Sequence, residues 1–129
     1  MKFHHIGIAC IDIPKTANFI HTVFNIVSET EIFFDKYQDV YLCLLTDEFG
    51  INIELVSGKI VEGYVKKKQN LYHTCWEVTD ITKTIENFCT SGAVLISKPN
   101  PAVLFDNRKV AFLYTEIGIV ELLEGKIIG

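Results

Sequence analysis

The apolar positions of the chain follow a pattern that occurs twice. Each copy opens with an apolar run, at about residues 3–10 and 71–78, and an aspartate, Asp12 or Asp80, follows each run. An aspartate at this position can cap a helix, because its side chain accepts hydrogen bonds from the first unsatisfied N–H groups. Apolar residues then recur at helical spacing. They are Ala17, Ile20 and Phe24 in the first copy and Ile81, Ile85, Phe88 and Cys89 in the second. The pattern therefore predicts a strand and a helix at the start of each half.

Runs rich in β-forming residues complete each half, and turn-forming residues separate them. They lie near 27–34, 38–46 and 51–57 in the first half and near 93–97, 108–115 and 117–124 in the second. A polar segment, residues 58–70, joins the halves. We therefore expect one α+β domain over residues 1–129, made of two tandem βαβββ modules at about 1–57 and 71–129. The strands should form a curved sheet with the helices on its outer face.

The residues themselves repeat as well as the pattern. Residues 5–16 align with 73–84 at an offset of 68, the spacing from His5 to His73, and His, Asp, Ile, Lys and Thr recur in place. A second match aligns residues 51–56 with 118–123 at an offset of 67, the spacing from Glu54 to Glu121. Two matches with nearly equal offsets indicate two modules of equal length.

Composition and charge exclude several classes of function. The 129 residues are 49% apolar and 22% charged, which is typical of a globular domain. A formal charge of −4 disfavours binding to nucleic acid phosphates. No apolar run approaches the length of a membrane span, so we expect a cytoplasmic protein that binds no membrane. The four cysteines form no C-x-x-C pair and are expected to be reduced core thiols.

Strand alternation places the repeated histidines and glutamates together. Residues two apart on a strand share a face, and in most of these strands the other face is the more apolar. The helices should cover that apolar face. The opposite face then holds His5, Glu54, His73 and Glu121, while Gly7 and Ala9 leave room beside His5. His4 has no histidine at the equivalent position and is expected to be structural, as is His21.

A divalent metal ion accounts for these four residues together. A single strand histidine or glutamate is usually structural, but the duplication would bring two imidazoles and two carboxylates into one cavity. Two buried carboxylates without a cation cost several kcal/mol. Mixed imidazole and carboxylate ligation suits Co, Mn, Ni or Zn, and four protein ligands leave positions for substrate oxygens. We therefore predict one divalent metal with His5, Glu54, His73 and Glu121 as ligands.

The motifs resemble the vicinal-oxygen-chelate superfamily, which includes glyoxalase I, methylmalonyl-CoA epimerase, extradiol dioxygenases and bleomycin-resistance proteins. The resemblance covers the whole chain. Its motifs are at residues 5–9, 53–55, 72–81 and 120–122. The chain length and the motif sequences are most similar to those of methylmalonyl-CoA epimerase and of small proteins described as lactoylglutathione lyases. Residues 105–114 resemble the segment that precedes the last metal-ligand strand in those proteins.

The resemblance implies a metal-dependent epimerase, isomerase or lyase that abstracts a proton next to a thioester or carbonyl. It implies a small-molecule substrate such as an acyl-CoA or glutathione thioester, and a homodimer. Glu121 is the expected catalytic base, with Glu54 in the mirror role. The family's second catalytic glutamate is missing before the run at 38–46, where Tyr37 aligns most closely and Asp39 lies two residues away. Asp39 or Tyr37 is therefore a candidate to replace that glutamate as the second catalytic base.

Two further expectations concern the ligand. Arg108 and Lys109 precede the Glu121 strand and are expected to hold an anionic part of the substrate or a cofactor. The alternatives are glyoxalase I, which shares the ligand pattern and usually builds its site across a dimer, and a non-catalytic ligand-binding protein of the bleomycin-resistance type. Metal content distinguishes the enzyme from the binding protein.

Overall fold

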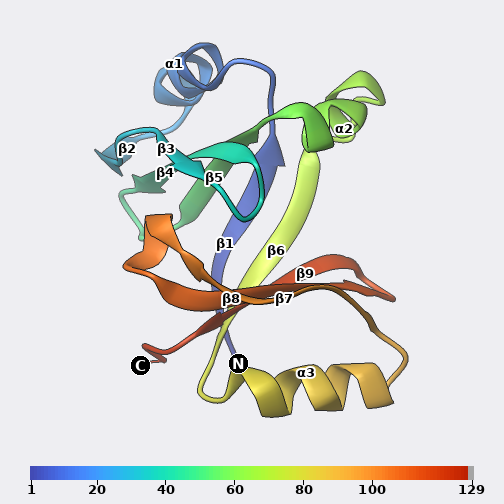
Figure 1. Cartoon of the computed structure of the whole chain (residues 1–129). Helices are drawn as coiled ribbons and strands as arrows, with labels where there is room; N and C mark the ends of the chain where they lie inside the picture. The colour runs from blue at the N-terminus through green and yellow to red at the C-terminus, as the bar shows by residue number, and fades with distance from the viewer. Residues whose placement is uncertain (128–129) are drawn as a thin grey trace. The chain divides into compact units, whose positions relative to one another are not determined.

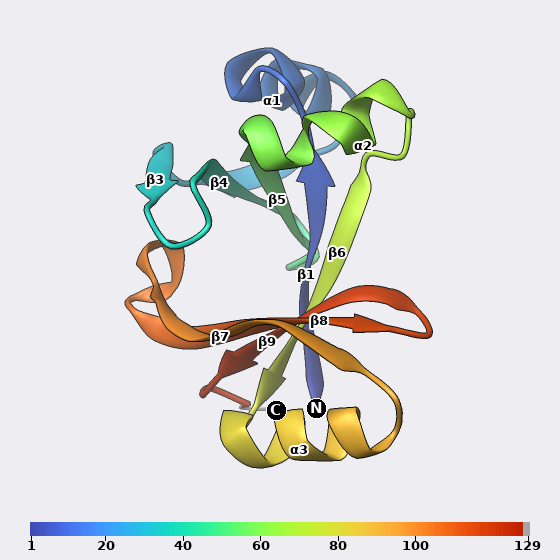
Figure 2. The same ribbon diagram turned by 45° about the vertical axis from the view of Figure 1, so that its right-hand side comes forward.

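The computed structural model describes residues 1–127, and the chain divides into two compact units. The first unit comprises residues 5–72, and the second comprises residues 73–129 together with residues 1–4. Figures 1 and 2 show the course of the chain through both units. Each unit contains strands and a long helix in the predicted order, which confirms the α+β class and the two βαβββ modules.

The first unit contains five strands and the helix α1. Its elements are β1 (Lys2–Ala9, from His5 onward), α1 (Ile13–Val23), β2 (Ile26–Glu29), β3 (Phe33–Asp35), β4 (Val40–Asp47), β5 (Asn52–Ser57), η1 (Lys59–Val61) and α2 (Glu62–Lys66). The strand order is β2-β4-β5-β1, and β3 also pairs with β4. Strands β1 and β5 are parallel, while β4 is antiparallel to its neighbours. The single run predicted near 27–34 is therefore two short strands.

The second unit repeats this arrangement. Its elements are β6 (Leu71–Val78, from His73 onward), α3 (Ile81–Thr90), β7 (Val94–Ala102), η2 (Val103–Phe105), β8 (Arg108–Thr115) and β9 (Gly118–Glu124). The order is β6-β9-β8-β7, with β6 parallel to β9 and the other pairs antiparallel. In both units a parallel pair therefore joins the first and last strands of the module.

Strand β7 continues five residues beyond the predicted end of its run. The strand includes Pro99 and Pro101, although proline cannot donate a ladder hydrogen bond. In this unit β7 pairs with β8 alone, and its register shifts between Leu95 and Ser97 and again before Asn100. An edge strand with irregularities accommodates prolines, so the strand persists.

Helix α1 covers one face of the first unit's strands (Figure 1). Its buried residues Ile13, Ala17 and Ile20 pack in a cluster with Ile53 and Leu55 of β5. Ile6 and Ile8 of β1 are partly buried against the same cluster. Phe24 was expected on this face but is 50% exposed, because the helix ends at Val23 and Phe24 is its extended C-cap.

Helix α3 covers the equivalent face of the second unit (Figure 2). Ile81 packs in a cluster with Val120 and Leu122 of β9, and Ile85 and Phe88 are partly buried against it. Cys89 was expected in this core but is exposed. One helical position is a rotation of about 100°, so Cys89 turns away from the strands that its neighbour Phe88 contacts. Helices on the face opposite the ligand residues are thus confirmed in each unit.

Both predicted helix caps are present. The side chain of Asp12 accepts a hydrogen bond from the Lys15 N–H at 3.1 Å, and that of Asp80 accepts one from the Lys83 N–H at 3.1 Å. Pro14 occupies the first turn of α1, where its missing N–H costs no hydrogen bond. Within residues 1–127, no helix is long and apolar enough to cross a membrane.

Candidate metal centre

His5 and Glu54 form a buried pair inside the first unit. Strands β1 and β5 are parallel with Gly7 beside Glu54, and His5 lies two residues before Gly7 on the same face. The His5 Nε2 and Glu54 Oε1 atoms are 3.6 Å apart, and the two side chains are 0% and 3% exposed. Glu54 points away from the helix-covered core because its neighbours Ile53 and Leu55 belong to that core.

His73 and Glu121 form the equivalent pair inside the second unit. Strands β6 and β9 are parallel with Cys75 beside Glu121, and His73 lies two residues before Cys75. The His73 Nε2 and Glu121 Oε1 atoms are 3.1 Å apart, and the side chains are 1% and 2% exposed. The ring of Phe112, which lies opposite Glu121 in the ladder, contacts the His73 ring edge to face at 5.4 Å. Phe112 thereby restricts the orientation of the imidazole.

The donor set of each pair suits a divalent metal. An ionised carboxylate out of contact with water needs a compensating positive charge. In each pair an imidazole nitrogen lies within 4 Å of the carboxylate, so two potential metal-ligand atoms are close together. Imidazole and carboxylate together are the ligands that first-row divalent metals accept. Each pair lies within one unit, at the position that the repeat assigns to it.

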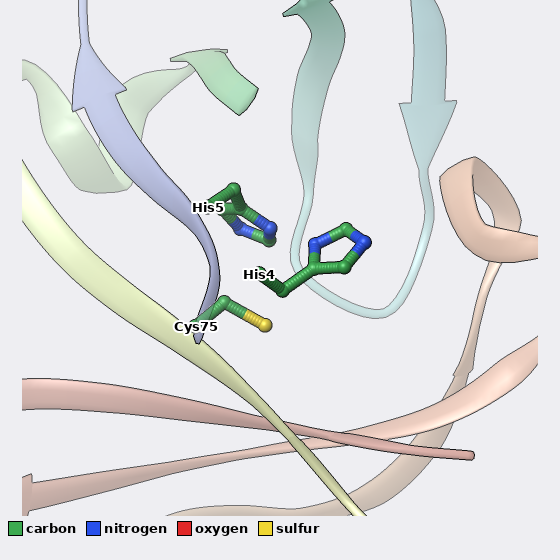
Figure 3. Close-up of side chains that lie close together, drawn as sticks. All are labelled: His4, His5 and Cys75. Atoms are coloured by element: carbon green, nitrogen blue, oxygen red, sulfur yellow. The ribbon is translucent and has the colours of Figure 1, made fainter. Parts of the chain in front are cut away.

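His4 differs from His5 although the two residues are consecutive in β1 (Figure 3). The His5 side chain is fully buried, whereas His4 is half-buried. The His4 ring packs edge to face against Phe105 with centroids 5.1 Å apart, and a His4 nitrogen lies within 4.8 Å of the buried thiol of Cys75. This aromatic packing agrees with a structural role. His21, also expected to be structural, forms an ion-pair contact with Glu29 at the surface.

The guanidinium of Arg108 is engaged within the protein. It donates to Glu77 Oε2 at 2.6 Å, to the Glu124 carbonyl at 2.9 Å and to the Gly125 carbonyl at 2.8 Å. The ion pair with Glu77 is largely buried. Lys109, the next residue, is exposed. The anion-binding role expected for Arg108 and Lys109 stays a prediction, and the contacts of Arg108 indicate a structural role.

The segment before β4 contains a buried carboxylate that sequence reasoning missed. Asp35 is 3% exposed and accepts hydrogen bonds from the backbone of Tyr37 and from the backbone and side chain of Gln38. An aspartate that bonds the backbone two residues ahead is a common turn former, and this was the available signal. Asp39 is exposed, with a left-handed φ of 56°. The turn thus presents Asp39 to solvent and retains Asp35 as its internal acceptor.

Three of the four cysteines, Cys10, Cys43 and Cys75, are buried as expected for core thiols. Burial raises the pKa of Cys10 above its ordinary value of 9.0, partly offset by a hydrogen bond with Thr16. Burial likewise raises the pKa of Cys43, which contacts the Thr30 carbonyl. A buried thiol with a raised pKa is a poor nucleophile, because only the thiolate reacts. Neither Cys10 nor Cys43 contributes to the candidate site.

Comparison with known proteins places these pairs in a family context. A family model described as the glyoxalase/bleomycin resistance protein/dioxygenase superfamily matches residues 4–112. Methylmalonyl-CoA epimerase from Mycobacterium tuberculosis has a similar structure, with a TM-score of 0.81, 16% identity and coverage of 97% of this chain and 88% of that chain. A hypothetical protein from Bacillus halodurans C-125 is also similar, with a TM-score of 0.76, 22% identity and coverage of 99% and 96%.

Glyoxalase I from Zea mays gives a TM-score of 0.66 at 19% identity, and the match covers 99% of this chain but 44% of the maize chain. No curated protein sequence matches this chain. At these identities the structural similarities establish a shared fold.

Proposed function

Since the chain belongs to the glyoxalase/bleomycin resistance protein/dioxygenase superfamily, we propose that it is a metal-dependent enzyme that abstracts a proton next to a thioester or carbonyl. The observation that carries this proposal is the pair of buried His–Glu contacts, His5–Glu54 and His73–Glu121, at equivalent positions of the repeat. Two such pairs supply the number and type of ligands that one divalent ion needs.

In this proposal His5, Glu54, His73 and Glu121 hold one Co, Mn, Ni or Zn ion. When bound, the ion supplies Lewis-acid stabilisation of negative charge on a substrate oxygen. The four side chains are almost fully buried, so they would hold the reacting part of the substrate away from bulk water. Exclusion of water strengthens every charge interaction at the site.

The proposed base is the carboxylate of Glu121. It is 1% exposed and lies 3.1 Å from His73, so its position is restricted before substrate binds. A positioned carboxylate takes a proton without a further ordering cost. Glu54 is the equivalent group in the first unit and is the candidate for the mirror role in proton return. Asp39 is a weaker candidate because its side chain is exposed in a turn.

The favoured substrate class is a small acyl-CoA thioester, and the favoured reaction is epimerisation. Support comes from the similarity of the fold to methylmalonyl-CoA epimerase over nearly the whole of both chains. The second candidate is a glyoxalase I reaction, which converts a glutathione hemithioacetal into a thioester, and the maize similarity supports it. A non-catalytic ligand-binding protein is the third, since the superfamily includes bleomycin-resistance proteins.

Solvent deuterium exchange tests the proposal. The protein, purified without chelator and assayed for metal, is incubated in D₂O with methylmalonyl-CoA or with the glutathione hemithioacetal of methylglyoxal. Mass spectrometry then measures deuterium incorporation. Incorporation into the thioester supports the epimerase, and formation of lactoylglutathione supports the glyoxalase. Stoichiometric metal with neither reaction would overturn both substrates, and absence of metal binding would favour the ligand-binding protein.

A further inference from the structure

We infer that Arg108 is a positioning residue that holds together the two strands carrying His73 and Glu121. This inference rests on the proposed metal site, because it assigns Arg108 a role in the geometry of that site. One side chain, from β8, contacts both strands. It binds β6 through the carboxylate of Glu77 and β9 through the carbonyl groups of Glu124 and Gly125.

The guanidinium replaces backbone hydrogen bonds where the ladder ends. The last register pair between β8 and β9 is Val110 with Leu123, and the last between β6 and β9 is Val78 with Glu124. At the end of the ladder, the carbonyls of Glu124 and Gly125 are acceptors that need donors. The planar guanidinium presents several N–H groups in a fixed fork and bonds both carbonyls and a carboxylate at once.

The end of β9 is joined to three elements of the second unit. The Gly125 N–H donates to the Val78 carbonyl of β6 at 2.8 Å, and the Glu124 carboxylate accepts the Ile81 N–H at the start of α3 at 3.0 Å. Arg108 supplies the connection to β8 through the carbonyls of Glu124 and Gly125. The site ligand Glu121 lies three residues upstream in the same strand. Movement of this strand end would therefore be transmitted to Glu121.

Gly125 shows how closely the guanidinium packs on the backbone. Its φ is 108°, a conformation that other residues rarely adopt, and a Cβ there would lie 3.4 Å from Arg108 Nε. Glu77 is on the same face of β6 as His73, because strand residues four apart share a face. The ion pair thus lies on the ligand face of the unit, and its position depends on the register between β6 and β9.

The test compares three variants in the full-length chain. Arg108→Lys keeps the positive charge but loses the several N–H donors of the guanidinium. The double variant Arg108→Met with Glu77→Met removes both charges, so that neither is left buried without a partner. Lys98→Met is the matched control, because Lys98 is an exposed lysine on β7 of the same unit. Two properties are measured: amide hydrogen exchange of the metal-free protein, and Co²⁺ affinity from its visible absorption.

We expect the double variant to fold, with exchange of residues 119–124 about tenfold or more faster relative to residues 40–47 of the first unit. We expect Co²⁺ to bind about tenfold or more weakly, the range typical of groups that orient metal ligands. Arg108→Lys should give intermediate values, and Lys98→Met should match the wild type in both.

Each other result is decisive. Exchange and affinity within twofold of the wild type in the double variant would overturn the inference. Faster exchange with unchanged Co²⁺ affinity would show a purely structural residue, and weaker affinity without faster exchange would show direct action on the metal. Failure of the wild type to bind Co²⁺ would overturn the proposed function, and the exchange measurement would still decide whether Arg108 holds the end of β9.

Discussion

At the scale of residues, Glu121 is the candidate for two roles, metal ligand and catalytic base. Its carboxylate is buried beside an imidazole, and its strand neighbours Val120 and Leu122 belong to the helix-covered core. Substitution by glutamine keeps the shape and one oxygen of this side chain while removing its basicity. The role of Glu121 as a base is therefore separable by experiment from its role as a ligand.

We predict that Glu121→Gln lowers turnover about a hundredfold or more while measurable metal binding remains, because an amide oxygen can still bind a cation but accepts a proton poorly. Steady-state kinetics and metal titration of the same samples measure the two effects. Glu116→Gln, at the exposed turn, should leave both unchanged. Turnover near the wild-type rate would show that Glu121 is only a ligand, and the base would then be sought in Glu54, Asp39 or Tyr37.

We predict that Asp39→Asn changes turnover less than twofold. The side chain is exposed, and asparagine tolerates the left-handed backbone that Asp39 adopts. The rate of deuterium incorporation is the direct measurement, since a second base would act in proton return. A loss of tenfold or more with normal folding would identify Asp39 as that second base and reverse the order of the candidates.

We predict that one thiol per chain, Cys89, reacts rapidly with iodoacetamide at pH 8. Cys89 is exposed, whereas the other three cysteines are buried. Burial also raises the pKa of Cys10 and Cys43, so the folded protein keeps these thiols protonated. The contribution of these protonated thiols to the stability of the folded protein is fully present below the unfolded pKa near 9.0. It is lost as pH rises through the higher pKa of the folded state. Peptide mass spectrometry should find the label on Cys89, and a second rapidly labelled cysteine would contradict the burial.

At the scale of elements, the two long helices have the same kind of N-cap, but only the start of α3 has an additional contact with a strand. Both begin after an aspartate whose carboxylate accepts an N–H three residues ahead. Helix α3 has an additional constraint, because the Glu124 carboxylate of β9 accepts the Ile81 N–H. The start of α3 is thus determined by a local cap and by a contact distant in sequence.

We predict that Asp80→Ala lowers the free energy of unfolding by about 1 kcal/mol, the usual cost of losing an N-cap. Asp80→Asn should cost much less, since the amide oxygen can accept the same hydrogen bond from Lys83. Urea denaturation followed by circular dichroism measures both values. Equal losses for alanine and asparagine would indicate that the charge of Asp80 near the helix N-terminus is the stabilising factor.

At the scale of the whole molecule, the repeat supplies one His–Glu pair to each unit. A shared metal site needs both pairs, whereas two independent sites would each need one. Ligands with a high affinity for the folded chain also raise its stability, by about 2.7 kcal/mol when free ligand exceeds the Kd a hundredfold.

We predict that the chain binds one divalent ion and that His5→Ala and His73→Ala each abolish tight binding. Both substitutions remove one ligand of the same proposed centre, so each should also remove the metal-dependent rise in Tm. Equilibrium dialysis with metal analysis gives the stoichiometry, and thermal unfolding with and without Co²⁺ gives the shift. His21→Ala is the control, because His21 is at the surface of α1. Half of the bound metal remaining in either variant would show two independent sites.

Local sequence patterns determined the secondary structure of both modules and the strand face that carries the candidate ligands. The period of apolar residues and the capping aspartates predicted both modules, and strand alternation predicted which face carries His5, Glu54, His73 and Glu121. These features depend on residues a few positions apart, whose geometry is set by the backbone period.

Only the tertiary structure decided the features that depend on residues distant in sequence. The three acceptors of Arg108 are 16 to 31 positions away, so no local pattern indicates that its guanidinium is engaged. Strand β7 passes through two prolines because it lies at the edge of its unit, and Cys89 is exposed because α3 presents its other side to the strands. Which residues pack against an element depends on strand order and register, and these arise from the balance of contacts over a whole unit.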